Sequence, residues 1–147
     1  MPGEEDGAPP LGSLINDLRV ALRAAYDEVL GPLQLTVPQV GVMAAIARAP
    51  GACIAQLAQE KAVTPQSMAE QVAGLESAGL IRRRHGEGRG HVLELHLTRD
   101  GAQVLGRAWQ AMRAVEAQLW NDIGADDHAR FRELLRRHLA PLRHTAD

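Results

Sequence analysis

Aromatic residues and cysteine are scarce in this sequence of 147 residues. Aromatic side chains make up only 3% of the chain, so the core has to be aliphatic, and neither an aromatic cofactor cage nor a base-stacking platform is expected. The single cysteine, Cys53, excludes an intrachain disulfide and a cysteine-based zinc cluster, and it fits a reducing compartment. No charged residue adjoins Cys53 to activate its thiol, so we interpret it as an inert packed side chain rather than a redox sensor.

Long apolar runs and a large net charge are also missing. No hydrophobic stretch approaches the roughly 20 residues needed to span a bilayer, and the acidic start lacks the basic and apolar regions of a secretory signal. We therefore expect a cytoplasmic protein with no membrane partner. The formal charge of −2 argues against a protein that coats nucleic acid non-specifically. The charge is uneven, however, because residues 80–99 contain five arginines and only two glutamates.

The spacing of apolar residues predicts a mainly α-helical chain with one small β-hairpin. Residues 1–10 are acidic and rich in glycine and proline, which predicts a disordered tail. Apolar side chains then recur at helical spacing in stretches that start near residues 11, 37, 54, 65, 99 and 126. From residue 80 to residue 97 the period changes to two, around a glycine-rich turn at residues 86–90, as in a β-hairpin.

Threonine and proline mark the starts of two of these helices. Thr36 can cap one helix, with Gln39 three residues later as its partner in a capping box. Thr64 can cap a second helix, which starts with Pro65 and ends before Gly79. We expect the buried faces of the two helices to consist of Val40, Met43, Ala44 and Ala47 in the first and Met68, Val72 and Leu75 in the second.

Two short helices followed by a two-stranded ribbon are the element order of a winged helix-turn-helix. The second helix of such a pair enters the major groove of DNA, so its outer face has to be free. Here that face offers uncharged side chains that can address base edges, and Thr64 with the free amides can hold a phosphate. The same helix has no lysine or arginine, and Glu70 on it would be unfavourable towards phosphate or selective for cytosine. The predicted base-contacting residues are Gln66, Ser67 and Gln71.

The ribbon concentrates positive charge. Its four arginines are Arg82, Arg83, Arg84 and Arg89. We expect the three strand arginines to bind phosphates and Arg89, at the glycine-rich tip, to enter a minor groove. Binding that depends on these residues would be strongly salt-dependent.

In their order and spacing, several motifs resemble those of the MarR-type winged-helix regulators. The similarity runs from about residue 11 to residue 142. The motifs are Leu35-Thr-Val-Pro-Gln39, Leu57-Ala58, Val63-Thr-Pro-Gln-Ser67, Leu75-Glu-Ser-Ala-Gly-Leu-Ile81 and Leu95-His-Leu-Thr-Arg-Asp-Gly101. One departure lies at the ribbon tip, where Glu87 takes the place of the aspartate that the family carries two residues before its wing arginine.

The resemblance implies a transcriptional regulator that acts on double-stranded DNA. A homodimer would bind a pseudo-palindromic operator, and a small-molecule effector or an oxidant would relieve repression. Residues 34–98 would form the DNA-binding domain, and residues 11–33 and 99–143 would form a helical dimerisation layer.

Effector and metal sites are less clearly marked in the sequence. The predicted effector pocket is lined by Tyr26, Met43, Trp109 and Met112, for which core packing is the alternative interpretation. The ribbon histidines, His85, His91 and His96, can meet across the hairpin, but we interpret them as polar surface and expect neither metal nor cofactor.

Two other function classes are alternatives to DNA binding. One is a winged helix that binds another protein without DNA, which the acidic balance and the absence of cations on the recognition helix favour. The other is an enzyme, which we do not expect because no nucleophile–base set, carboxylate pair or phosphate-binding glycine loop can be assembled. The residues leave open whether a regulator of this kind represses or activates.

Overall fold

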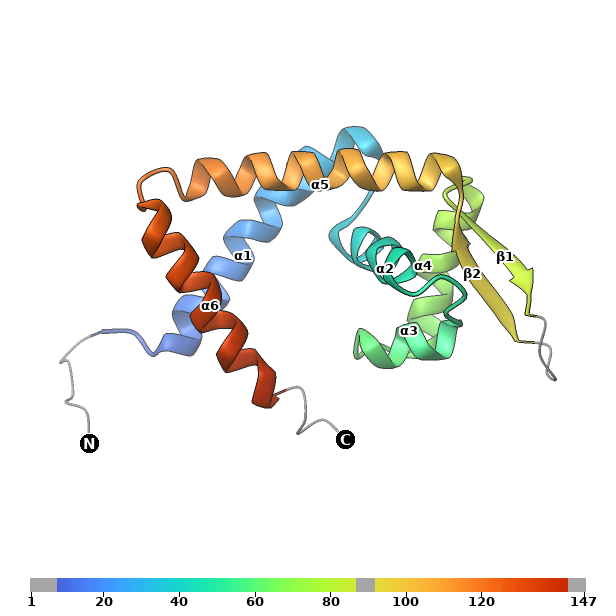
Figure 1. Cartoon of the computed structure of the whole chain (residues 1–147), viewed down its shortest axis with the longest axis horizontal. Helices are drawn as coiled ribbons and strands as arrows, with labels where there is room; N and C mark the ends of the chain where they lie inside the picture. The colour runs from blue at the N-terminus through green and yellow to red at the C-terminus, as the bar shows by residue number, and fades with distance from the viewer. Residues whose placement is uncertain (1–7, 87–91, 143–147) are drawn as a thin grey trace. The chain divides into compact units, whose positions relative to one another are not determined.

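The computed structural model describes residues 8–86 and 92–142 and confirms the predicted mainly helical fold with a small β-wing (Figure 1). The elements follow the order α1 (Leu11–Leu30), the short 3-10 helix η1 (Gly31–Leu33), α2 (Val37–Arg48), α3 (Ile54–Glu60), α4 (Pro65–Ser77), β1 (Ile81–His85), β2 (Leu93–Leu97), α5 (Arg99–Leu119) and α6 (Ala125–Leu142). The chain divides into two compact units, Met1–Met112 and Arg113–Asp147. Most of the expected tail, the ribbon tip with Arg89, Glu87 and the histidine at position 91 lie outside the described residues.

The first unit has an aliphatic core, as the low aromatic content predicts. Its most deeply buried side chains include Leu30, Met43, Ile46, Met68 and Leu95, each at most 1% exposed. They come from α1, α2, α4 and β2, so the core joins the helical elements to the wing. Burial of this apolar surface is the main force that holds the wing and the helices of this unit together.

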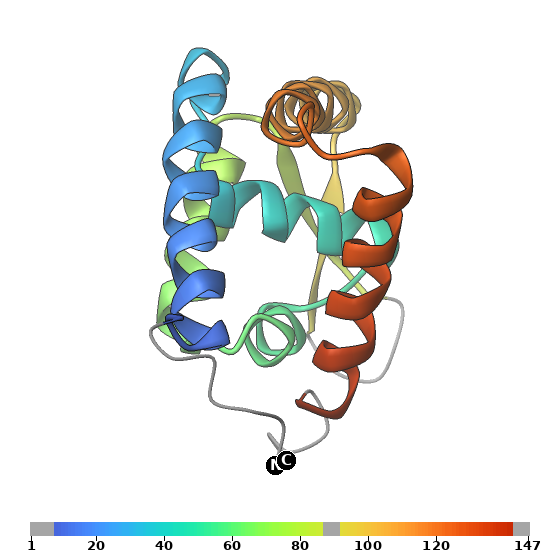
Figure 2. The same cartoon turned by 90° about the vertical axis from the view of Figure 1, so that its left-hand side faces the viewer.

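Helix α2 lies at the centre of the first unit, and its buried surface differs from the predicted one. The predicted buried face included Ala44 and Ala47, but Ala47 is exposed and Ala44 only half-buried, whereas Val42 and Ile46 are buried. The reason is that α2 packs against α1, α4 and β2 on different sides, so its apolar surface exceeds one stripe. The axis of α2 is bent by 75° from that of α1 and η1. Figure 2 shows α2 crossing the middle of this unit.

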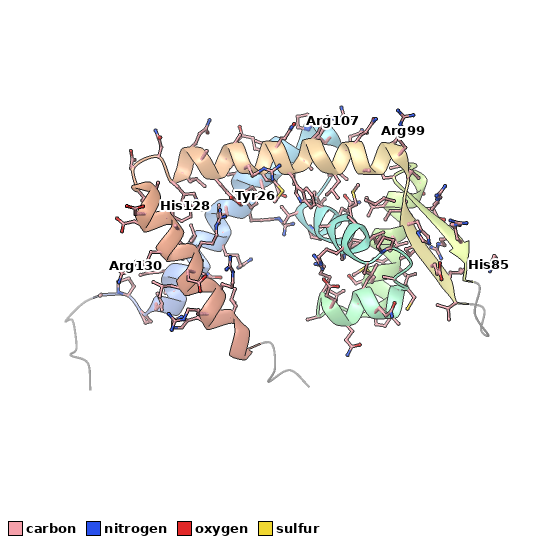
Figure 3. The ribbon with its side chains drawn as sticks, in the orientation of Figure 1. Tyr26, His85, Arg99, Arg107, His128 and Arg130 are labelled. Atoms are coloured by element: carbon pink, nitrogen blue, oxygen red, sulfur yellow. The ribbon has the colours of Figure 1, made fainter. Side chains whose placement is uncertain are left out.

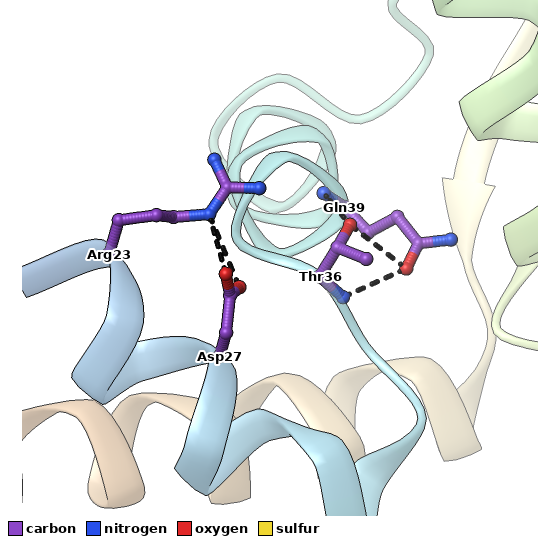
Figure 4. Close-up of polar contacts among 4 residues, drawn as sticks. All are labelled: Arg23, Asp27, Thr36 and Gln39. Atoms are coloured by element: carbon purple, nitrogen blue, oxygen red, sulfur yellow. Dashed lines mark hydrogen bonds and ion pairs between the residues drawn. The ribbon is translucent and has the colours of Figure 1, made fainter. Parts of the chain in front are cut away.

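The predicted helix starts are confirmed in atomic detail. At the start of α2, the Thr36 amide donates to the Gln39 Oε1 atom at 3.0 Å, and the Gln39 amide donates to Thr36 Oγ1 at 3.4 Å (Figure 4). At the start of α4, the Ser67 amide donates to Thr64 Oγ1 at 3.1 Å. Gly79, just after α4, has the positive φ of 74° that glycine adopts without strain.

The wing is an antiparallel pair with one protected edge. In its register Ile81 lies opposite Leu97 and His85 opposite Leu93. On the other side of β2, the Gly51 amide donates to the Leu95 carbonyl and the Leu95 amide donates to the Ala52 carbonyl, both at 3.0 Å. The loop between α2 and α3 therefore covers the outer edge of β2 and attaches the wing to the helix pair.

The start of α5 is tied to the end of α4. Thr98 Oγ1 donates to the Gly79 carbonyl at 2.7 Å and accepts from the Gly101 amide at 2.9 Å. The Thr98 amide donates to the Leu80 carbonyl at 3.0 Å. Gly101 itself lies against Leu80, where any Cβ atom at position 101 would be only 2.0 Å from the Leu80 carbonyl oxygen. Thr98 and Gly101, two residues of the motif that ends at Gly101, therefore hold the start of α5 against the end of α4.

The second unit consists of the last turns of α5, the connection and α6. The Trp120 ring packs against His128 and Phe131, with ring centroids 5.5 Å and 5.4 Å apart. Asp126 and Asp127 lie in the first turn of α6, where they complement the positive end of the helix. Among the described residues of the whole chain, no single helix has the length and hydropathy of a membrane span, although α1 with η1 and α2 together do so as a bent pair.

Candidate nucleic-acid interface

Helix α4 presents a continuous exposed stripe on the side opposite its buried face. Met68, Val72 and Leu75 anchor the helix and are at most 1% exposed. The exposed stripe comprises Gln66, Glu70, Ala73 and Ser77, which recur every three or four residues. The recognition helix of the predicted winged helix-turn-helix therefore keeps one face free.

The three predicted base-contacting residues differ in position. Gln66 is exposed within the stripe, and Ser67 is half-buried at its side. Gln71 is half-buried, and its Oε1 atom is shielded from solvent with no hydrogen-bond partner among the described residues. The prediction that Gln71 faces outward is wrong, because five residues after Gln66 correspond to about 140° around the helix and place it beside the core. In this conformation its carbonyl cannot meet a base.

The three arginines of β1 lie on two different faces of the wing. Arg82 and Arg84 alternate with Arg83 along β1, and both are exposed. Arg83 is half-buried and turns towards α4, where its Nε atom donates to Glu76 Oε2 at 2.9 Å. Two of the three strand arginines are thus available to a ligand, and the third links the wing to the recognition helix.

Other exposed arginines of the first unit lie away from this surface. Arg99 and Arg107 project from the side of α5 that faces away from α2 and α4 (Figure 3). Arg48, on α2, forms an ion pair with Glu60 of α3. The positive charge adjacent to the free face of α4 therefore comes from β1.

The charge on α4 itself is negative. The helix has two acidic residues, Glu70 and Glu76, and no basic ones. Arg83 neutralises Glu76, whereas Glu70 has no ion pair or hydrogen bond with any residue in the described part of the chain. Glu70 is therefore the one charge on α4 that a ligand of the exposed stripe would meet unneutralised.

The ribbon histidines are not brought together as a metal site within the described residues. His85 lies opposite Leu93 and His96 opposite Arg82 in the strand register. His96 Nε2 is 3.2 Å from Glu94 Oε2 on the same strand. No group of three histidine, cysteine or acidic residues is placed to hold a metal ion within residues 8–86 and 92–142.

The four residues of the predicted effector pocket have different environments. Met43 is fully buried, and Tyr26 and Met112 are partly buried against the core, so for these three the structure supports the alternative of core packing. Trp109 is 41% exposed. A shallow pocket of about 410 Å³ lies instead in the second unit, where Trp120, His128 and Arg132 contribute to its walls.

Two residues of the site were not anticipated from the sequence. The ion pair of Glu76 with Arg83 joins residues seven positions apart across a helix–strand turn, a distance at which no local spacing rule applies. Glu94 carries no motif, but a Cβ atom at Gly51 would lie 3.5 Å from its carboxylate, and one at Gly86 2.8 Å. The only sign of Glu76 and Glu94 in the sequence is their negative charge close to the arginines of β1.

Comparison with known proteins gives consistent matches. The family model described as the MarR family matches residues 33–90. The HTH-type transcriptional repressor Rv2887 of Mycobacterium tuberculosis is 32% identical over 126 residues, which cover 86% of this chain and 91% of the relative. The transcriptional regulator HosA of Escherichia coli is 32% identical over 103 residues, covering 70% and 76% of the two chains.

Solved structures extend the similarity to the whole fold. A crystal structure of Rv2887 in complex with DNA matches with a TM-score of 0.77 and 28% identity, over 88% of this chain and 98% of that one. A complex of the same protein with salicylic acid matches with a TM-score of 0.74 and 30% identity, over 89% and 97%. A crystal structure of MarR matches with a TM-score of 0.86 and 26% identity, over 97% of both chains.

Proposed function

The chain belongs to the MarR family of transcriptional regulators, and we propose that it is a repressor that binds a pseudo-palindromic operator in double-stranded DNA as a homodimer. The observation that carries this proposal is the exposed stripe of α4 next to a strand with two exposed arginines. A helix that is anchored on one side and free on the other is what entry into a major groove requires. The crystal structure of the relative Rv2887 in complex with DNA supports DNA as the ligand.

Base recognition and affinity come from different elements in this proposal. Gln66 and Ser67 contact base edges from the first turn of α4, and Thr64 with the adjacent amides lies next to a phosphate. Arg82 and Arg84 contribute the electrostatic part of the affinity, together with Arg89 at the wing tip. Arg83 supports binding indirectly, because Glu76 holds it against α4.

The dimerisation layer consists of residues 11–33 and 99–143, around a DNA-binding domain of residues 34–98. Exposed apolar side chains support this division. They are Leu11, Leu14, Ile15 and Val20 on α1, Leu119 at the end of α5, Ile123 in the connection that follows, and Leu134 and Leu139 on α6, each between 40% and 68% exposed. Apolar side chains that repeat along both terminal helices are typical of a surface that another subunit covers.

The regulator acts without catalysis, since its curated relatives are named as transcriptional repressors or regulators. Its place of action is the cytoplasm, where it has access to DNA. A small-molecule effector relieves repression by binding one arrangement of the two DNA-binding domains more tightly than the other. The salicylic-acid complex of Rv2887 makes small aromatic acids the first effectors to test.

Fluorescence anisotropy with DNA from upstream of the chain's own coding sequence tests the proposal. We expect sequence-specific binding whose affinity falls steeply with salt. Arg82→Ala and Arg84→Ala should each lower the slope of log K against log[salt] by about 1.8, because each change removes two phosphate contacts per dimer at about 0.9 each. Gln66→Ala should instead relax the preference at one position per half-site.

The matched control is Arg107→Ala, which removes the same charge from the far side of α5. It should leave the affinity and the salt slope close to those of the wild type. Equal losses of affinity and of salt slope in the Arg82, Arg84 and Arg107 variants would show that only the overall charge of the protein matters. Absence of any salt-dependent binding would favour the alternative of a protein-binding module and refute the proposal.

A further inference from the structure

Glu70 has an unusual place on the recognition helix. It lies in the middle of the exposed stripe of α4, one turn after Gln66. The residues three and four positions away on the helix are Gln66, Ser67, Ala73 and Gly74, none of which is a cation. No residue in the described ranges binds its carboxylate, so no contact within residues 8–86 and 92–142 requires an acid at this position.

A carboxylate at this position discriminates strongly among base pairs. An ionised carboxylate only accepts hydrogen bonds. In the major groove, guanine presents two acceptors, thymine presents an acceptor and a methyl group, and adenine presents a donor next to an acceptor. Cytosine alone presents its N4 amino donor without an adjacent acceptor, and it is the base with which glutamate pairs.

We infer that Glu70 is a specificity-determining residue that selects a cytosine in each half-site and rejects other bases at that position. The inference rests on the proposed function, since it requires α4 to enter the major groove. Glu70 also has a second effect on binding. The phosphates repel its negative charge whichever DNA sequence is bound. The affinity from the wing arginines compensates for this repulsion, and only an operator with the cytosine gains a hydrogen bond in return.

Neutral substitutions separate these two effects. Glu70→Ala removes both the repulsion and the hydrogen bond, so binding to unrelated DNA should strengthen about threefold to tenfold at low salt while the preference for cytosine disappears. Glu70→Gln also removes the charge but can pair with adenine, so the preferred base should change from cytosine to adenine. Glu5→Gln, which lies before α1 in the sequence and outside both the dimerisation layer and the DNA-binding domain, is the control for loss of one negative charge elsewhere.

The experiment selects bound duplexes from a randomised pool with the full-length wild type and each variant, and sequences them. We expect the wild-type and Glu5→Gln pools to share a palindrome with a strongly preferred cytosine at one position per half-site. The Glu70→Ala pool should retain the rest of the palindrome and lose that preference, by about tenfold or more in relative affinity.

The possible failures are distinguishable. If the wild type selects a palindrome and both Glu70 variants select the same one with the same base preferences, the inference about Glu70 is wrong and the proposed function stands. If the wild type enriches no sequence, the proposed function fails and the inference with it. Thermal unfolding of each variant should match the wild type, since the Glu70 side chain has no partner among the residues that the structure describes. A large loss of stability would contradict the assignment.

Discussion

Replacement of Gly101 by alanine tests how α5 is attached to the DNA-binding elements. Alanine is a better helix former than glycine, so helix propensity alone predicts that Gly101→Ala stabilises the protein by up to about 1 kcal/mol. The structure predicts the opposite sign. A Cβ atom at this position would lie 2.0 Å from the Leu80 carbonyl oxygen and 2.9 Å from its carbonyl carbon. Both atoms belong to the backbone and cannot turn away as a flexible side chain does.

The size of the effect follows from what must move. The Leu80 carbonyl would have to retreat by about 1 Å, and its hydrogen bond from the Thr98 amide, now 3.0 Å long, would be lost or weakened. Overpacking in a rigid place costs about 1–3 kcal/mol, and each disrupted hydrogen bond about 1 kcal/mol. Even after the gain of up to about 1 kcal/mol in helix propensity, we expect Gly101→Ala to lower the free energy of unfolding by about 1–3 kcal/mol.

Gly106→Ala is the matched control on the same helix. A Cβ atom at Gly106 meets no other atom within 4 Å, so this change should raise the free energy of unfolding by about 0.5–1 kcal/mol. Urea unfolding followed by circular dichroism measures both variants, at one fixed protein concentration because dimerisation contributes to stability. A Gly101→Ala protein as stable as the wild type would refute the close contact with Leu80. Similar losses in both variants would show that steric contact is not the cause.

Three further predictions concern the cap of α2, the link between wing and α4, and the dimerisation layer. Thr36→Ala removes the capping box and should lower the free energy of unfolding by about 1 kcal/mol in the same urea experiment; no change would mean that the cap is redundant. Alanine substitutions at Glu76 and Arg83, singly and together, form a double-mutant cycle. Because the ion pair is partly exposed, we expect a coupling energy of about 0.5 kcal/mol. A coupling energy of zero would rule out the link between the wing and α4. Leu14→Glu and Leu134→Glu should each weaken dimerisation at least tenfold in sedimentation equilibrium, since each change places a charge in the proposed interface twice. A dimer as stable as that of the wild type would exclude the substituted residue from the interface.

Local signals predicted most of the elements and their ends. The pair Thr36 and Gln39 three residues apart predicted a capping box, and the structure contains both of its hydrogen bonds. Thr64 followed by Pro65 predicted the start of α4, and Gly79 its end. Such features depend on residues within four or five positions of each other, so the geometry of the chain itself brings them together.

The candidate site was predicted in outline but not residue by residue. Gln66 and the exposed pair Arg82 and Arg84 lie where the helical and strand periods place them. The sequence predicts Gln71 on the outer face of α4, yet its amide oxygen is buried at the side of the core. The sequence predicts Arg83, like its neighbours, to be a phosphate ligand, but alternation along the strand turns it towards Glu76. At these two positions the neighbouring elements, rather than the residue type, determine what the side chain can contact.

Sequence patterns alone are sufficient for the class of fold, the order of its elements, the aliphatic core and the location of the positive charge, because periodicity and composition act over short stretches of chain. Packing decided how much of α2 is buried, which wing arginines remain free, and why position 101 must be glycine. Each of these depends on atoms that are distant in the sequence, such as the Leu80 carbonyl facing Gly101 or the Glu76 carboxylate facing Arg83. Contacts of this kind form only when the whole unit folds, so no local pattern encodes them.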